Sequence, residues 1–579
     1  MYVLNQAVCA SAARAAAFLL LCCAQARAAG GAWLKSPWVE GPQLSGPIVA
    51  QEKPGARKSK AGGLIAGDFF DIPGPREGGP PDLSIAAGPG VLLCVVGPKW
   101  GVYTLSGECL FESSLSDWFA AFEPPGRVAE AQVLFDREAG RWLLCAVSSD
   151  PDSAFSAYLI SVSDDADPMG VWWGWLLDAG YNGTEEDFTT VRDLRFGPAG
   201  DRFLVISSDQ YAAGGDFLYA RLRLLHRAQL YWEGEGSALS WRDFWALLNK
   251  VGAPANHFRP VEEPQGGSSG YLVSSWVDAE SGSFTLWRFA GDTLSLVKEF
   301  YGSQLGPEPV AQPGTDVVLY ASEPPLGNAV FKDGHLVIVH EAGYGTEEEK
   351  QAAVGVIDYQ PDRGLLRAFL YTDRWNAFFS PSLTLSSTGH VVLACNVSSS
   401  DTPLRTNVTR DSLSILRFGP IVPVVQGEGA VETPRIEGGV RWRRGCALSV
   451  GAGPCKGEVW VAGAFASGNP PWSVRVRRVL LQECFVRGDS SLDGAVDLAD
   501  AVAILGYLFT GPFENPCPKT MDNNDDGRIN IADAVFLLGY LFGGGEQPAP
   551  PFPSCGPDPT PGGFIPLCAS YPPCLSEAE

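Results

Sequence analysis

The chain has 579 residues, 45% of them hydrophobic and 19% charged, which is enough for one large domain and one or two small ones. Its formal net charge is −24, which argues against a basic nucleic-acid-binding surface over the chain as a whole. The acidity suits solubility and divalent cations but does not identify a partner. Beyond the N-terminal stretch, no run of apolar residues is long enough for a transmembrane segment.

Residues 1–28 have the pattern of a secretory signal peptide. An apolar stretch runs from Ala15 to Ala24, and Ala26-Arg27-Ala28 fits a small-x-small cleavage site. An uncleaved membrane anchor is the alternative, but the apolar stretch is too short to span a bilayer comfortably. We therefore expect a secreted protein after removal of this segment. Residues 29–80 are rich in Gly, Pro and Lys, which predicts a poorly ordered lead-in.

Residues 81–420 contain no long helical pattern, and we expect a mainly β domain there. Short runs rich in Val, Leu, Trp and Tyr are separated by Gly, Pro and Asp. One unit recurs, consisting of a short strand, a turn with Gly and a run of apolar residues. The unit occurs at Asp82–Val95, Gln132–Val147, Asp193–Ser207, Pro260–Trp276, Ala329–Val339 and Pro381–Asn396.

The spacing of these units, roughly 50 to 70 residues, is close to that of propeller blades with insertions. We predict a β-propeller of six or seven blades over 81–420, with a pair of β-sandwiches as the alternative. Residues 421–483 are predicted to be a small strand unit or a linker. The stretches 134–142 and 163–173 resemble a family of secreted bacterial propeller-like proteins, many of them from planctomycetes. That resemblance implies an extracellular bacterial protein but no fixed activity.

Two acidic segments, 33 residues apart, each combine a loop with an apolar helical pattern. Over 489–511 and 522–544, 13 of 23 aligned residues are identical. Calcium loops of twelve residues bind through positions 1, 3, 5, 7, 9 and 12, with Gly at the turn in position 6. Here Gly494 and Gly527 occupy that position. Two matches at the same offset from a helix argue against acidic turns that bind nothing.

The spacing therefore predicts two calcium ions, one in each loop. The first loop supplies side chains of Asp489, Ser491, Asp493, Asp497 and Asp500 and the carbonyl of Ala495, and the second those of Asp522, Asn524, Asp526, Asn530 and Asp533 and the carbonyl of Arg528. Position 12 is Asp instead of the usual Glu, so the helix must begin closer to the ion. Because Ser491 is a weak neutral ligand, we expect the first loop to bind calcium less tightly.

No helical pattern precedes either loop, so each unit is a loop followed by an exit helix. With these features residues 484–545 resemble a dockerin domain. In that family, positions 10 and 11 contact a cohesin partner. Here Leu498-Ala499 and Ile531-Ala532 replace the hydroxyl-bearing residues common in cellulosomal members. The resemblance thus implies a calcium-dependent fold more strongly than a cohesin-like partner.

Residues 546–579 form a Pro-rich and Cys-rich tail with Cys555, Cys568 and Cys574, while Cys484 and Cys517 belong to the repeat. Export permits disulfides among these residues, although their pairing cannot be deduced from the sequence. A zinc site is the alternative, but the region has no CxxC pair and no His.

The propeller segment has none of the common catalytic motifs: HExxH, GxSxG, a Walker loop or GxGxxG after a strand. The five His residues are scattered, and we interpret them as structural. Sugar-cleaving enzymes use paired carboxylates, and the acidic residues are plentiful, but their spacing singles none of them out. They include Glu185, Glu186, Asp187, Asp193, Glu262 and Glu263, beside Trp172, Trp173, Trp175 and Trp276, which could stack on sugar rings but more commonly pack in cores.

We therefore predict a secreted, non-catalytic binding protein with a calcium-dependent dockerin-like module. The alternative is a polysaccharide-degrading glycoside hydrolase, since dockerins often accompany such enzymes, although that association is not a physical argument. The expected partner is a cohesin-like protein or a cell-surface polysaccharide.

Overall fold

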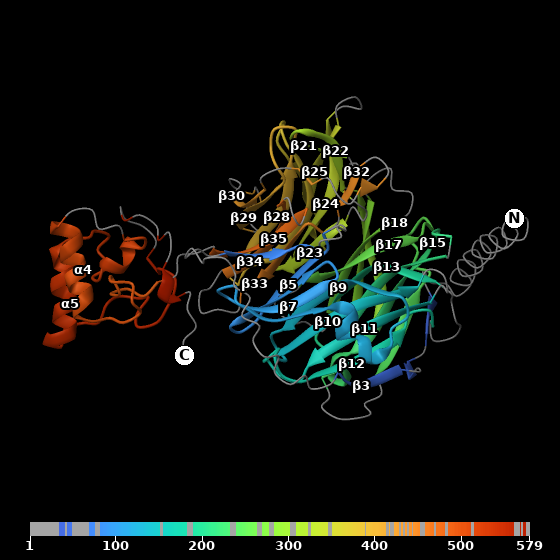
Figure 1. The fold of residues 1–579 in the computed structure, drawn as a ribbon, viewed down its shortest axis with the longest axis horizontal. Helices are drawn as coiled ribbons and strands as arrows, with labels where there is room; N and C mark the ends of the chain where they lie inside the picture. Colours follow the sequence, from blue (N-terminus) through green and yellow to red (C-terminus); the bar gives the residue numbers. More distant parts are fainter. Residues whose placement is uncertain are drawn as a thin grey trace, which may run out of the picture. The chain divides into compact units, whose positions relative to one another are not determined.

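The computed structural model describes the chain in two compact units (Figure 1). The first comprises residues 1–385, 390–449 and 460–477, and the second comprises 386–389, 450–459 and 478–579. The described residues are all those of the chain except 1–33, 37, 41–42, 49–68, 76–80, 151–154, 182–188, 213, 232–238, 263–268, 277–282, 302–308, 322–325, 346–349, 388, 413–415, 417, 419–421, 428–429, 432–434, 437–438, 443, 452–457, 468–470, 481–484, 511–514, 561–564, 566–567, 569–570 and 575–579. The predicted signal peptide lies outside them. Within them, no helix is long and apolar enough to cross a membrane.

The first unit is a β-propeller. Among the described residues, five separate sheets have the blade pattern of four antiparallel strands. Their strands are β5 (Leu83–Ala87), β6 (Val91–Val96), β7 (Lys99–Thr104) and β8 (Cys109–Ser114); β9 (Arg127–Asp136), β10 (Arg141–Asp150), β11 (Phe155–Ser163) and β12 (Trp172–Asp178); β13 (Thr190–Pro198), β14 (Phe203–Tyr211), β15 (Phe217–His226) and β16 (Ser240–Trp245); β27 (Ala377–Leu385), β28 (His390–Ser398), β29 (Arg405–Ser412) and β30 (Val422–Gln426); and β33 (Cys446–Val450), β34 (Glu458–Ala466), β35 (Trp472–Leu480) and β4 (Phe69–Pro73).

An eight-stranded sheet joins two further antiparallel meanders through a parallel pairing of their first strands, β17 and β23. The meanders are β17 (Ala255–Glu262), β18 (Ser269–Trp276), β19 (Ser283–Ala290) and β20 (Thr293–Tyr301), and β23 (Leu326–Lys332), β24 (His335–Gly345), β25 (Lys350–Gln360) and β26 (Gly364–Tyr371). A small mixed sheet contains β21 (Pro309–Gln312), β22 (Thr315–Ala321), β31 (Arg435–Ile436) and β32 (Gly439–Trp442). Short helices α2 (Leu115–Trp118), η1 (Ala120–Phe122) and α3 (Arg227–Leu230) lie in connections.

The prediction of a mainly β propeller is confirmed, and the alternative of two β-sandwiches is wrong. The six predicted repeat units fall on the first two strands of six meanders, from β5–β6 to β27–β28. Six or seven blades were predicted, whereas five stand as separate sheets among the described residues. The difference arises where Val261 and Glu262 of β17 pair with Ala329 and Val330 of β23, which merges two meanders into one sheet.

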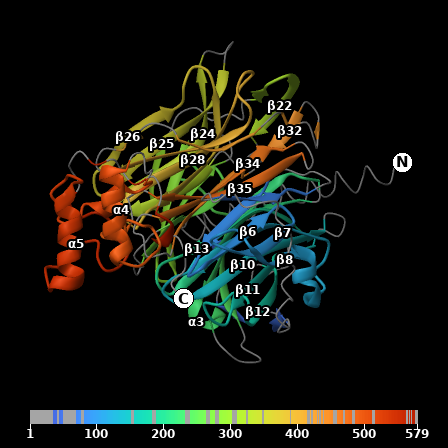
Figure 2. The same cartoon turned by 60° about the vertical axis from the view of Figure 1, so that its left-hand side comes forward.

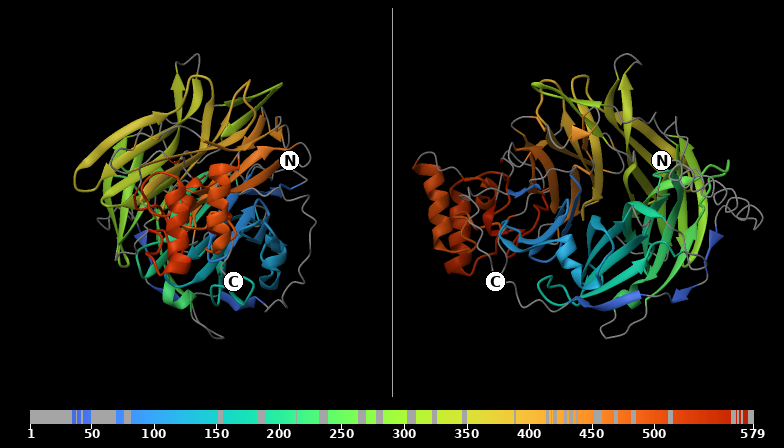
Figure 3. Two further views of the ribbon diagram at one scale, coloured as in Figure 1. Left: turned by 90° about the vertical axis from the view of Figure 1, so that its left-hand side faces the viewer. Right: turned by 45° about the vertical axis from the view of Figure 1, so that its right-hand side comes forward.

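The last blade closes the ring of sheets with a strand from the other end of the chain. Strand β4 pairs with β35, with Ile72 opposite Val474, and Arg475 donates two hydrogen bonds of 2.7 Å to Asp71. The backbone N–H of Leu83, in the first blade, donates to the carbonyl of Arg444, just before β33. In Figure 2, the orange strands β34 and β35 accordingly lie beside the blue β6 and β7. Figure 3 shows the sheets following one another around a common axis.

Two predicted boundaries are therefore corrected. Residues 29–80 are not simply a poorly ordered lead-in, because β4, β1 (Leu34–Lys35), β2 (Val39–Glu40) and β3 (Gln43–Ile48) all pair with propeller strands. The propeller also does not end at residue 420, since β33–β35 form its last blade. Both boundaries depend on pairing between strands that are far apart in the chain. Such pairing produces no local sequence pattern, so the sequence could not reveal it.

The second unit contains the paired loops and their exit helices, α4 (Leu498–Phe509) and α5 (Ile531–Gly543), with short helices η2 (Pro518–Met521) and η3 (Pro572–Cys574). Ala501, Ile504, Met521, Ala534 and Leu537 form its core between the helices. Each helix begins at loop position 10, as the repeat predicts.

The tail is part of this unit, which corrects the predicted boundary after residue 545. Tyr571 and Cys574 are buried with Phe485 and Val486. Disulfides Cys517–Cys568 and Cys555–Cys574 engage four of the cysteines in this unit, so the disulfide prediction is confirmed for these pairs and their sulfur atoms are not free to bind zinc. Cys484 lies outside the described residues.

The pairing of β4 with β35 predicts a large effect of a small change in β4. Ile72 is only 4% exposed, so Ile72→Ala should lower the free energy of unfolding by about 2–4 kcal/mol through lost burial and a cavity. Phe69→Ala, in the same strand but 43% exposed, should cost less than about 1 kcal/mol. Urea unfolding of both variants measures this, and equal effects would contradict a closing role for β4.

Candidate functional site

The first strands of five meanders contain a β-bulge, and at several of these bulges polar side chains contact the next blade. The register shifts at this point in β9, β13, β17, β23 and β27. At Glu130, Asp193, His257 and Ser380 the bulged residue has φ between 50° and 55°, a region that non-glycine residues rarely adopt. Bulges of this kind re-aim side chains and occur beside functional sites.

Some of these side chains connect neighbouring blades. The carboxylate of Glu130 accepts a hydrogen bond of 3.1 Å from the backbone N–H of Leu194 in the next blade. Gln132 accepts one of 2.8 Å from the N–H of Phe196. Such bonds satisfy buried backbone groups that a bulge leaves unpaired in its own sheet. This part of the bulge pattern therefore has a structural role.

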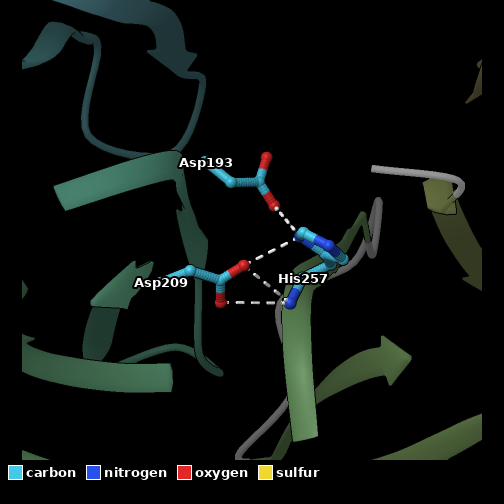
Figure 4. A group of neighbouring side chains, drawn as sticks. All are labelled: Asp193, Asp209 and His257. Atoms are coloured by element: carbon cyan, nitrogen blue, oxygen red, sulfur yellow. Dashed lines mark hydrogen bonds and ion pairs between the residues drawn. The ribbon is translucent and has the colours of Figure 1, made fainter. Parts of the chain in front are cut away.

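The bulges at Asp193 and His257 form a cluster with Asp209 of β14 (Figure 4). Nδ1 of His257 lies 3.0 Å from Oδ2 of Asp193 and 2.8 Å from Oδ2 of Asp209. The backbone N–H of His257 also donates to Asp209, at 3.2 and 3.3 Å from its two oxygens. The imidazole, from β17, thus joins two carboxylates of the neighbouring blade, one on β13 and one on β14.

Two arginines, each two residues beyond a bulge, complete the cluster. Nη2 of Arg195 lies 3.1 Å from Oδ1 of Asp193, and Nη1 of Arg259 lies 2.7 Å from Oδ2. Nε of Arg259 also donates to the carbonyls of Leu326 and Gly327, at 3.0 and 2.9 Å. Buried charges are tolerated when they are paired and hydrogen-bonded in this way.

The surroundings push the pKa values of the two aspartates apart. Burial opposes ionisation of Asp193, but Arg195, Arg259 and His257 outweigh it and hold the pKa of its carboxyl well below the usual value. Burial raises the pKa of Asp209, which His257 offsets only in part. Asp193 is therefore the ionised member of the pair, and Asp209 takes up a proton more readily.

The pKa of His257 is shifted upward by the same two groups. Burial by itself would lower it, but Asp209 and Asp193 outweigh that effect and raise the pKa to about 9. His257 is therefore an imidazolium at neutral pH. Its side chain is only 9% exposed, so the positive charge depends on the carboxylates that face it.

The three side chains offer a nitrogen and two carboxylate oxygens within 4.8 Å of one another, as a divalent metal ion would require. However, both oxygens of Asp193 already accept hydrogen bonds from guanidinium groups. A cation would have to share these oxygens with two positive charges. We therefore interpret the cluster as an ion network of the protein's own side chains.

Further buried acids surround the axis. Burial raises the pKa of Glu341 to about 8, although the N–H of Ser380 donates to it at 2.9 Å. Burial likewise raises the pKa of Glu262 to about 7, and Thr384 donates to it at 2.9 Å. These carboxyls face backbone and hydroxyl donors, and neither shares the contacts of the Asp193 cluster.

The acidic and aromatic residues considered in the sequence have different places in the structure. Asp193 lies in the cluster, whereas Glu185, Glu186, Asp187 and Glu263 fall outside the described residues. The tryptophans are core residues: Trp172, Trp175 and Trp276 are buried, and Trp173 is partly buried.

From the sequence, we interpreted His257 as a structural residue, and nothing in the residues around it indicates that it joins a cluster of carboxylates. Its partners lie 48 and 64 residues away, and only the blade arrangement brings them together. Trp375, which is 76% exposed just before β27, was also missed.

The predicted calcium loops have matching backbones. Leu492 and Asp525 at position 4 and Gly494 and Gly527 at position 6 all have positive φ. Oδ2 of the position-1 aspartate accepts from the position-6 N–H, at 2.8 Å in the first loop and 3.0 Å in the second. Repeated conformation thus accompanies the repeated sequence.

Position 12 has a second role at the start of each helix. Asp500 and Asp533 are the N3 residues of capping boxes whose N-caps are Asp497 and Asn530, both at position 9. The short aspartate therefore holds the helix start close to the loop, as the sequence predicts. Burial raises the pKa of Asp500, and raises that of Asp533 to about 6.

The predicted ligands of each loop include both buried and exposed side chains. Asp489, Asp500, Asp522 and Asp533 are buried, while Asp493, Asp497 and Asp526 are exposed. Backbone N–H groups at positions 5 and 9 donate to side-chain oxygens at positions 1, 3 and 12. The donor set is entirely oxygen, which is the chemistry that calcium prefers. Tyr571 of the tail donates to Asp489.

Each exit helix exposes the same apolar positions. Leu498, Val502 and Phe509 of α4 are matched by Ile531, Val535 and Phe542 of α5, and all six are more than half exposed. Large apolar side chains in such an arrangement are typical of interaction surfaces.

Comparison with known proteins adds structural likeness only. No protein-family model matches the chain, and no curated protein matches it. A sialidase from Trypanosoma rangeli is similar over 66% of this chain and 57% of its own, at 10% identity and a TM-score of 0.33. The GH93 α-L-arabinofuranosidase of Fusarium graminearum is similar over 50% of this chain and 93% of its own, at 9% identity and a TM-score of 0.29. A protein of unknown function from Dyadobacter fermentans covers 71% of this chain and 99% of its own, at 12% identity and a TM-score of 0.34.

The raised pKa of His257 predicts a stability that falls with rising pH. His257 binds its proton more tightly in the folded state than in the unfolded state, which stabilises the fold. This contribution to the free energy of unfolding is complete below the unfolded pKa of about 6.5 and is lost as the pH rises toward 9. Urea unfolding from pH 6 to pH 9.5 should show a loss of about 3 kcal/mol at most. The loss should be much smaller in His257→Gln. A pH profile that is the same in both proteins would contradict a charged His257.

Proposed function

We propose that the propeller is a polysaccharide-degrading glycoside hydrolase whose chemistry takes place at the Asp193–Asp209–His257 cluster. One observation carries the proposal: two carboxyls with pKa values pushed in opposite directions lie on the adjacent strands β13 and β14, where both contact Nδ1 of His257. Glycosidic cleavage needs this division of roles, with one carboxyl protonated and the other ionised.

The roles follow from the electrostatics of the pair. Asp209 acts as the acid that protonates the leaving oxygen, and Asp193 acts as the carboxylate that stabilises or attacks the sugar. Their oxygens lie within 4.8 Å of each other, close to the separation of about 5–5.5 Å that goes with retention of configuration. The imidazole of His257 contacts both carboxylates and so holds them in position, and it shares a proton with Asp209.

Trp375 supports a sugar as the ligand. It is 76% exposed and precedes β27, at the end of the strand that also carries the Ser380 bulge. An exposed indole at this end offers a flat apolar face for a sugar ring.

A non-catalytic polysaccharide-binding protein is the second candidate. It is favoured by the contacts of Asp193, whose two oxygens are held by Arg195, Arg259 and His257. A carboxylate held in this way is well placed to orient arginines, and a reaction would require it to exchange partners.

For the propeller itself, we propose seven blades. The five separate sheets are joined by the two meanders β17–β20 and β23–β26, each of which has four antiparallel strands. On this view, the parallel contact of β17 with β23 is a close approach of two inner strands in adjacent blades.

For the second unit, we propose a dockerin-like module that binds two calcium ions in a secreted protein. The matching loop backbones, the all-oxygen donor sets and the disulfides support this. The exposed apolar positions of α4 and α5 are the surface for a cohesin-like partner.

Substitution of either aspartate should abolish hydrolysis. With a panel of neutral and acidic polysaccharides, Asp193→Asn and Asp209→Asn should each lower the release of reducing sugar by about 100-fold or more. Asp358→Asn is the matched control, because Asp358 is also buried and lies 2.9 Å from a histidine, His335. The wild-type protein binding a polysaccharide without cleaving any would establish the non-catalytic alternative.

Calcium binding is tested on the full chain by calorimetry. Two ions should bind the wild-type protein, and Asp526→Ala should remove one of them, since Asp526 is an exposed ligand whose loss leaves the core intact. Asp493→Ala should remove the other ion, which we expect to be the weaker. Glu546→Ala serves as an acidic control outside the loops. Unchanged heats in both loop variants would disprove the calcium sites.

A further inference from the structure

Two guanidinium groups from other blades, those of Arg259 and Arg444, lie close enough to Arg195 for their charges to act on it. Arg195 and Arg259 hold the two oxygens of Asp193, at 3.1 and 2.7 Å. Arg444, just before β33, pairs with Asp82, just before β5. Burial first, and then the charges of Arg259 and Arg444, lower the pKa of Arg195 to about 9, although Asp193 and Asp82 act in the opposite direction. Positive charge is therefore crowded at this place.

Two of these guanidinium groups have an N–H group without a partner. Nη2 of Arg259 and Nη1 of Arg444 are buried and make no hydrogen bond within the part of the chain that the structure describes. The Arg259 side chain is only 1% exposed, and its other nitrogens are engaged by Asp193, Leu326 and Gly327. A buried donor without an acceptor is costly, and more so when it is charged. Among the described residues, the arrangement therefore lacks an acceptor for these two N–H groups.

We infer that the free N–H groups of Arg259 and Arg444, together with Arg195, bind an oxyanion of the ligand, either a carboxylate or a sulfate ester on a sugar. Guanidinium groups present paired donors that suit such oxyanions. Access is available from the sides of Arg195 and Arg444, whose side chains are 12% and 18% exposed.

The inference deepens the proposed function and rests on it only in taking the ligand to be a glycan. It makes the ligand an acidic glycan, in which the charged group sits on the arginines while the neighbouring glycosidic bond faces the aspartates. Among the hydrogen bonds and ion pairs of the described residues, Arg444 pairs with Asp82 and contacts neither Asp193 nor Asp209, so a change at Arg444 can separate binding from cleavage.

The test uses three sugars with the full-length protein in calorimetry: galacturonate, its neutral methyl ester and galactose 6-sulfate. The wild-type protein should bind at least one of the charged sugars about tenfold or more tightly than the methyl ester. Preference for galacturonate identifies a carboxylate ligand, and preference for galactose 6-sulfate identifies a sulfated one. Equal binding of the neutral ester, or no binding of either charged sugar, would overturn the inference.

Variants then assign the binding to the arginines. Arg444→Gln should weaken the preferred charged sugar about tenfold or more, in line with the loss of a charge-assisted hydrogen bond, and leave the methyl ester unaffected. Arg227→Gln is the matched control, since its side chain is 13% exposed and pairs with Asp136 away from the cluster. If Arg444→Gln is unstable, Arg444→Lys keeps the charge but lacks the second N–H group and should lose affinity too.

Equal affinities in the wild-type protein and in a folded Arg444 variant would place any charged-sugar binding elsewhere and contradict the inference. A protein that binds the charged sugar but cleaves no polysaccharide would leave the oxyanion site standing and remove only the hydrolase. Conversely, cleavage of neutral polysaccharides without affinity for charged sugars would retain the hydrolase and remove the oxyanion site.

Discussion

The antiparallel pairing of β4 with β35 is the constraint on which the rest of the propeller depends. Without β4, the last blade would have only β33, β34 and β35. The pairing completes this blade with a strand from the other end of the chain and so links the two ends of the series of blades. It also brings residues 362 positions apart into contact, as Asp82 and Arg444 show.

The bulged positions near the axis contribute both to the stability of the propeller and to the proposed chemistry. The bulges at Glu130, Asp193, His257 and Ser380 adopt a backbone conformation that costs of order 1–3 kcal/mol each, so the surrounding structure must hold them. Side chains such as Gln132 do so by bonding to the next blade. The neighbouring bulges direct ionisable groups at one another, which accounts for the opposite pKa shifts of the two aspartates. A regular strand would have pointed these side chains to alternate faces of its own sheet.

The second unit is organised on a different principle. Its two loops are specified almost entirely by local sequence, because the turn glycines, the acidic side chains and the helix caps all lie within twelve consecutive residues. Asp500 and Asp533 serve both the loop and the start of the helix. The tail adds a long-range element: Tyr571 donates to Asp489 of the first loop, and the Cys517–Cys568 disulfide joins the tail to the segment before the second loop.

The sequence by itself determined the features that depend on neighbouring residues. It identified the hairpins of six meanders, the propeller fold, the two exit helices and the residues of the acidic loops, because strand alternation, turn glycines and helix caps act over a few positions. Tertiary structure alone decided which strands close the ring, where the propeller ends and that the tail belongs to the second unit. It also decided that His257 meets Asp193 and Asp209, since these contacts join two blades and residues that are 64 and 48 positions apart in the sequence. Hydrogen bonds and ion pairs between blades carry no periodicity along the chain, so no local pattern could have revealed them.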